Sequence, residues 1–106
     1  MLAGKLIRLH LSEADKHEGQ PLYEAIVALC RARQIAGATV LRGLEGFGGT
    51  AAIHRPHFIE GDSPISVVII DSEEKIQDLL PELEKLVETA LIAVSSVWMR
   101  RLEKPV

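Results

Sequence analysis

The chain has 106 residues, 47% of them apolar and 25% charged, with a formal net charge of −3. This length predicts one domain over residues 1–106 with one modest core. No cluster of basic residues is present, so a cationic face that binds nucleic acid is not expected. Cys30 is the only cysteine, which excludes an internal disulfide and favours a reducing, cytoplasmic location. Because neither a signal peptide nor an apolar run of about 20 residues is found, no membrane insertion is expected.

The first half of the chain predicts a strand, a helix and a second strand. Lys5–Leu11 alternates apolar and polar residues, which is typical of a half-buried strand. After a polar connection, apolar residues recur at helical spacing from Pro21 to Gln34, and Gly37 is the expected helix stop. Ala38–Glu45 is predicted as the second strand.

The second half predicts a strand, a helix and a last strand, after a loop that extends to about residue 63. Pro64–Asp71 is strongly β-prone and apolar on both faces. Asp71 is predicted to cap the following helix, with Glu74 completing a capping box. Pro81 lies within that helix, so a kink or a break is expected there. Leu91–Met99 is predicted as the last strand.

This order of elements predicts a ferredoxin-like split βαβ fold (βαββαβ) of the α+β class. Right-handed crossovers place both helices on one face of a four-stranded antiparallel sheet. The other face is left without a cover, although it must receive apolar residues from several strands, including Leu6 and either Ile92, Val94 and Trp98 or the residues that alternate with them. An exposed apolar surface of this extent predicts self-association.

The loop begins with a run of glycines. Gly46, Gly48 and Gly49 permit turns with positive φ, and their backbone amides are also able to cradle an anion. Phe47 is interpreted either as a loop anchor or as a stacking platform for a base. These residues are therefore candidates for a ligand-binding segment.

The loop also carries cationic and imidazole side chains. His54 and His57 have a His-x-x-His spacing, but Pro56 between them argues against a helix that aligns both rings for a metal. Arg55 is the stronger candidate, because a guanidinium group binds phosphate with two hydrogen bonds. Arg100 and Arg101, after the last strand, are either solvated or directed at a ligand.

With the loop placed between the second and third strands, the sequence resembles a known family. The run "AGATVLRGLEGFGG" is similar to the second strand and first loop residues of PII signalling proteins. The run "GFGGTAAIHRPHFIEGDSPI", followed by "IIDSEEKI", resembles PII-like signalling proteins of a conserved domain-of-unknown-function branch. The resemblance covers nearly the whole chain.

The resemblance implies a homotrimer whose open sheet faces pack inward. It implies a non-enzymatic regulator that binds an adenine nucleotide in clefts between subunits, with no obligatory cofactor. The loop 46–63 would contact a target protein such as a transporter, channel or enzyme. The implied ligand-binding residues are Gly46, Phe47, Gly48, Gly49, His54, Arg55, Arg100 and Arg101.

One segment departs from the family pattern. PII proteins carry a phosphate-binding loop rich in glycine and lysine before the last strand, whereas "VETALIAV" at residues 87–94 contains neither residue. AMP or ADP is therefore expected in preference to ATP.

Two other functions are alternatives on this fold. Acylphosphatases cradle phosphate beside an arginine, but they need an asparagine, and this chain has none. A metal-binding trimer of the CutA type would depend on His54 and His57 alone. We therefore predict neither catalytic residues nor a metal site.

Overall fold

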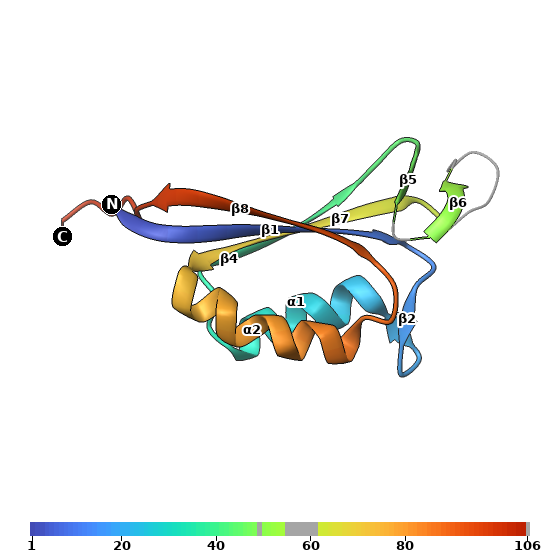
Figure 1. Cartoon of the computed structure of the whole chain (residues 1–106), viewed down its shortest axis with the longest axis horizontal. Helices are drawn as coiled ribbons and strands as arrows, with labels where there is room; N and C mark the ends of the chain where they lie inside the picture. Colours follow the sequence, from blue (N-terminus) through green and yellow to red (C-terminus); the bar gives the residue numbers. More distant parts are fainter. Residues whose placement is uncertain (49, 55–61, 106) are drawn as a thin grey trace.

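The computed structural model describes residues 1–48, 50–54 and 62–105, with side chains for 1–46 and 62–105. Four antiparallel strands form one sheet in the order β4-β7-β1-β8. Two helices cover one face of this sheet (Figure 1). The predicted ferredoxin-like arrangement is confirmed. The bounds of these elements are β1 Leu2–Ser12, α1 Leu22–Ala32, β4 Gly37–Arg42, β7 Pro64–Ser72, α2 Glu73–Leu86 and β8 Leu91–Met99.

Two short hairpins lie outside this sheet. The polar connection before α1 contains β2 (Lys16–His17) and β3 (Gln20–Pro21). Residues 18 and 19, which join them, have φ angles of 49° and 83°, and such left-handed pairs suit the twist of a two-residue hairpin turn. A second hairpin pairs β5 (Gly46–Gly48) with β6 (Thr50–His54). The prediction of a loop over residues 46–63 is therefore wrong for these two strands.

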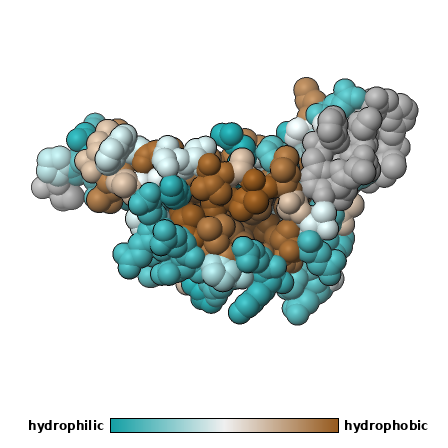
Figure 2. Space-filling view, viewed as in Figure 1, coloured by the Kyte–Doolittle hydropathy of each residue, from teal (hydrophilic) through white to brown (hydrophobic). Residues whose placement is uncertain are grey.

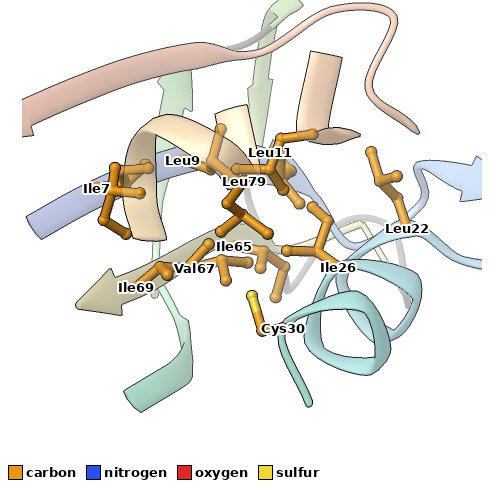
Figure 3. Close-up of a cluster of buried hydrophobic side chains, with 12 residues drawn as sticks. Ile7, Leu9, Leu11, Leu22, Ile26, Cys30, Ile65, Val67, Ile69 and Leu79 are labelled. Carbon is orange, nitrogen blue, oxygen red and sulfur yellow. The ribbon is translucent and has the colours of Figure 1, made fainter. Parts of the chain in front are cut away.

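The core lies between the sheet and the helices (Figure 3). The two central strands, β1 and β7, direct every second side chain toward the helices, and Ile7, Val67 and Ile69 are each 0% exposed. The buried cluster comprises Ile7, Leu9, Leu11, Leu22, Ile26, Cys30, Ile65, Val67, Ile69, Ile76, Leu79 and Leu83. Full burial of one such aliphatic side chain is worth about 1.5–3 kcal/mol, so this cluster dominates the stability of the fold.

The end of α1 differs from the prediction. The helix ends at Ala32, and Gln34 takes a left-handed conformation with φ 55°. The Ile35 amide donates to the Cys30 carbonyl at 3.0 Å, and the Gln34 amide donates to the carbonyl of residue 31 at 3.1 Å. These two bonds form a Schellman motif around Gln34. The expected stop, Gly37, instead begins β4.

The start of α2 also differs. Ser72 is the N-cap, and its hydroxyl accepts from the Lys75 amide at 3.3 Å. Asp71 is buried and accepts from the Ala36 amide at 2.8 Å, so it joins the α1–β4 connection to β7 and does not form a capping box. The helix continues through Pro81, so the predicted break there is wrong, while a kink stays a prediction.

The strand register decides which side chains face away from the helices. Val68 and Ile70 alternate with the buried residues of β7 and lie opposite Arg8 and Leu6 on the open face. On β8 the second of the two expected sets faces that way, because Ile92, Val94 and Trp98 share the helix-side face of Leu9 and the residues that alternate with them lie on the open face. Ile92, Val94 and Trp98 nevertheless remain 43%, 51% and 74% exposed, since β8 is an edge strand.

Candidate functional site

Residues 43–63 connect β4 to β7, and we call them the glycine segment. A pocket of about 330 Å³ opens at the end of the sheet where this segment begins. Its walls come from the end of β1, the end of β4, the first residues of β7 and the connection to β5. We call it the sheet-end pocket. This volume is near the lower limit for small-molecule sites, so the pocket would enclose only part of a nucleotide. Its lining residues are His10, Leu11, Leu41, Arg42, Gly43, Glu45, Gly46, Pro64, Ile65 and Ser66.

The first residue of the glycine segment, Gly43, packs against the start of β7. The Gly43 amide donates to the Pro64 carbonyl at 2.8 Å. A Cβ atom at Gly43 would lie 2.9 Å from Cγ of Pro64, which is too close for any side chain to be accommodated without a shift. Gly46 approaches the same proline less closely, because a Cβ there would lie 3.8 Å from the ring. Glycine at 43 therefore permits the close packing that starts the segment.

The last residues of the glycine segment are hydrogen-bonded to the end of β1 and the residue that follows it. The Ser12 hydroxyl donates to Oδ1 of Asp62 at 2.7 Å, and the Glu13 amide donates to the Ser63 carbonyl at 2.8 Å. Ser12 and Ser63 are only 3% and 4% exposed, so these bonds are shielded from water. Both ends of the segment between β4 and β7 are thus anchored on the same end of the sheet.

The charges at this end of the sheet are mixed. Arg42 forms an ion pair with Glu13, and its side chain remains 60% exposed. His10, which lines the pocket, is half-buried on the open face. A guanidinium group beside bare glycine backbone is able to contact an anion, although the Glu13 carboxylate neutralises part of its charge.

The predicted site residues fall into four groups, of which the last is Arg100 and Arg101. Gly46 lines the sheet-end pocket, and its backbone pairs with His54, so the β5–β6 hairpin brings these two residues together. Phe47 and Gly48 lie in β5. Gly49 and Arg55 lie outside the described residues.

Arg100 and Arg101 are placed at the far end of the sheet. They follow Met99, which pairs with Leu2, whereas the glycine segment begins at the end of the sheet that holds Ser12. Ten residues of strand separate these two ends of β1, a span of roughly 33 Å. A single chain therefore does not bring the two arginines to the pocket.

Sequence reasoning missed the residues that hold the segment in place. The sequence predicts no role for Ser12, Gly43 or Asp62, and it places Arg42 only within a strand. One pattern pointed to this arrangement, because a glycine inside a predicted strand often marks a bulge or a close backbone approach. The bond from Ser12 to Asp62 joins residues 50 positions apart, and no local pattern indicates it.

Comparison with known proteins identifies the family. Residues 4–99 match the family model DUF190, described as an uncharacterized ACR. The chain belongs to this family. It is 38% identical over 82 residues to a UPF0166 protein of Aquifex aeolicus, covering 76% of this chain and 78% of that protein. It is 30% identical over 89 residues to a UPF0166 protein of Methanocaldococcus jannaschii, covering 83% and 82%.

Solved structures show where else this fold occurs. CPII, a nitrogen regulatory PII-like protein from Thiomonas intermedia, superposes with a TM-score of 0.70 at 22% identity, over 93% of this chain and 90% of that one. That structure holds ADP, AMP and bicarbonate. A candidate PII-like signaling protein from Thermus thermophilus gives 0.65 at 18% identity, over 92% and 90%. The DUF190 chain thus has the PII-like fold, and the resemblance seen in the sequence is confirmed.

Two further observations concern the described part of the chain. Neither of its helices is long and apolar enough to cross a membrane. Within the same residues, no three His, Cys, Asp or Glu side chains are grouped so that they could hold a metal ion. His57, one of the two histidines in the predicted spacing, lies outside the described residues.

Proposed function

We propose that this DUF190 protein is a cytoplasmic, non-enzymatic regulator of the PII-like type. It consists of one domain over residues 1–106, assembles as a homotrimer and binds an adenine nucleotide as an effector. The observation that carries the proposal is the sheet-end pocket, which Gly46 helps to line, in a fold whose neighbour CPII was solved with ADP and AMP.

The open face of the sheet supports the trimer. Leu6, Val68 and Ile70 lie together there, and no element among the described residues covers them. Water is displaced from these aliphatic side chains when a second copy packs against them, which is favourable by about 25 cal/mol for each Å² of apolar surface.

The nucleotide lies in a cleft between subunits. The backbone of Gly46, Phe47, Gly48 and Gly49 lines it from one chain, because amides without bulky side chains approach a phosphate closely. His54 and Arg55 reach it from the same segment. Arg100 and Arg101 come from a neighbouring subunit, since the length of the sheet separates them from Gly46 in their own chain.

The preferred ligand is AMP or ADP. The connection between α2 and β8 offers the backbone of Val87 to Ala90 with no glycine or lysine to hold a third phosphate. The ligand signals by favouring one conformation of the segment 46–63, which a target protein such as a transporter or channel then recognises.

Isothermal titration calorimetry with AMP, ADP, ATP and cyclic adenine nucleotides tests the proposal. AMP or ADP should bind more tightly than ATP. The variant Arg101→Ala should weaken binding by about 10- to 100-fold, because a charge-assisted hydrogen bond contributes roughly 1.5–3 kcal/mol. Gly48→Val should also weaken binding without dissociating the trimer. Arg31→Ala, an arginine in the last turn of α1, is the matched control and should leave affinity unchanged.

Two results would contradict the proposed site. One is the absence of submillimolar binding by every nucleotide in the set. The other is unchanged affinity in both Arg101→Ala and Gly48→Val. Nucleotide hydrolysis that survives repurification and is lost in Arg55→Ala would contradict the non-enzymatic assignment.

A further inference from the structure

An apolar groove lies between the edge strand β8 and the C-terminal half of α2. Leu80, Leu83 and Val87 form its helix side, and Ile92 forms its strand side. Figure 2 shows a continuous hydrophobic surface between the strand layer and the helix layer in this region. We call it the β8–α2 groove.

The size and rim of the groove restrict what it binds. Its volume is about 150 Å³, below the usual range of cavities that take up a small-molecule ligand. Such a cavity suits one aliphatic side chain. Glu84 and Glu88 lie at its rim, so the segment that carries this side chain should also carry positive charge.

The C-terminal segment of the chain has this combination. Leu102 is 81% exposed and directly follows Arg100 and Arg101, with Lys104 two residues later. The one carboxylate nearby, Glu103, is 3.9 Å from Arg101 in a weak exposed pair. The segment is therefore a cationic peptide with a single leucine anchor.

Leu102 is out of reach of the groove in its own chain. Ile92 and Met99 are separated by seven residues of β8, or roughly 23 Å. The three residues from Met99 to Leu102 span at most about 11 Å when fully extended. Only another molecule can supply the leucine.

We propose that the segment 100–105 of one copy docks in the β8–α2 groove of a second copy, with Leu102 as the anchor and its flanking cations beside Glu84 and Glu88. The donor and the acceptor are different surfaces, so the contact is head-to-tail, and in the proposed homotrimer three such contacts complete the ring. The inference rests on the proposed homotrimer and adds the contact that orders its subunits.

The docking also bears on the ligand site. Ile92 pairs with Leu9, close to the end of β1 that lines the sheet-end pocket. A docked segment thus places Arg100 and Arg101 at the same end of the neighbouring sheet as the pocket, but on the helix side of β8, whereas His10 and Ser66 line the pocket on the open face.

Disulfide cross-linking of nucleotide-free protein tests the docking directly. The double variant Leu102→Cys/Glu88→Cys should form covalent dimers and trimers under mild diamide oxidation, at least tenfold more than Leu44→Cys/Glu88→Cys. Leu44 is the matched control because it is a leucine that is 91% exposed on another part of the surface. The native Cys30 is buried and should not contribute.

Light scattering on the same samples separates the two proposals. A trimer whose cross-linking does not exceed that of the control overturns the docking and leaves the proposed function standing, whereas a monomer overturns both. In a second measurement, Leu102→Asp should raise the dissociation constant of the trimer at least tenfold, and Leu44→Asp should not. Equal dissociation constants for these two variants would also overturn the docking.

Discussion

The two faces of the sheet are made by the same strands but have different chemistry. Along β7, the residues directed at the helices are buried, with Ile65 3% exposed and Val67 0% exposed. Their neighbours Val68 and Ile70 are also aliphatic but are only half-buried, because no helix lies over them.

The difference extends to charge. On the covered face, the central part of β1 contributes only aliphatic side chains, whereas on the open face it contributes Arg8 and His10 beside Val68. A charge in a domain core needs a partner, but charges at the margin of an interface help to fix orientation and partner choice. The covered face therefore supplies most of the stability of the domain, and the open face, which keeps aliphatic and charged side chains together, is the surface on which the proposed trimer depends.

The largest effect should come from a charge on the covered face. The variant Val67→Asp buries a carboxylate with no partner, at a cost of several kcal/mol, comparable to the whole stability of a small domain. We expect loss of the folded state in circular dichroism and urea titration. A cooperative unfolding transition at the wild-type midpoint would contradict this account of the core.

The adjacent position tests the open face. Val68→Asp should yield a folded monomer, because the carboxylate remains in water until a second copy covers it. Light scattering gives the mass, and circular dichroism checks the fold. Val68→Thr, whose side chain has nearly the shape of valine and no charge, should remain a trimer. A trimer of undiminished stability in Val68→Asp would show that subunits meet elsewhere.

A smaller effect, the pH dependence of stability caused by Cys30, should report how well the covered face excludes water. Burial raises the pKa of the Cys30 thiol from 9.0 to about 11. Because the neutral thiol is favoured in the folded state, its contribution to stability is present below pH 9. That contribution is lost as the pH rises from 9 toward 11. The free energy of unfolding should fall over this range relative to Cys30→Ala, whereas parallel curves for the two proteins would contradict it.

The smallest effect concerns the outer surface of the helices. Arg33 donates to Glu82 at 2.7 Å through Nε, and this bond lowers the pKa of the Glu82 carboxyl from its ordinary 4.5. A lowered pKa stabilises the fold above pH 4.5, and the contribution is lost as the pH falls below that value. Glu82→Gln should slightly lower the urea midpoint at pH 7 but not at pH 3, with Glu74→Gln as the control. An equal change at both pH values would exclude the ion pair as its cause.

Local sequence patterns were sufficient to predict the main strands and helices. Leu91–Met99 was predicted with the bounds it has, since a run of apolar and β-branched residues favours a strand wherever it lies. Local sequence patterns gave a wrong prediction where a polar side chain accepts a hydrogen bond from a backbone amide far away in the sequence. Asp71 follows the rule for a helix cap, yet its carboxylate accepts from Ala36, 35 residues earlier, and Ser72 takes the capping role.

The candidate site was predicted only in part. The glycine run indicated the end of the sheet at which the sheet-end pocket opens, because glycines in series mark a backbone that needs close approach. The anchors at Ser12 and Gly43 escaped notice, since their partners, Asp62 and Pro64, are brought to them only by the pairing of β7 with its neighbours.

The order of strands and helices, and so the fold class, follows from periodicity and turn residues that act over a few positions. The tertiary structure decided which face each aliphatic residue of β8 occupies, since this depends on its register with β1. It also decided that Arg100 and Arg101 lie a whole strand length from Gly46. Separations of this kind depend on how segments that are distant in the sequence pair in the sheet. They therefore cannot be predicted from spacing along the chain.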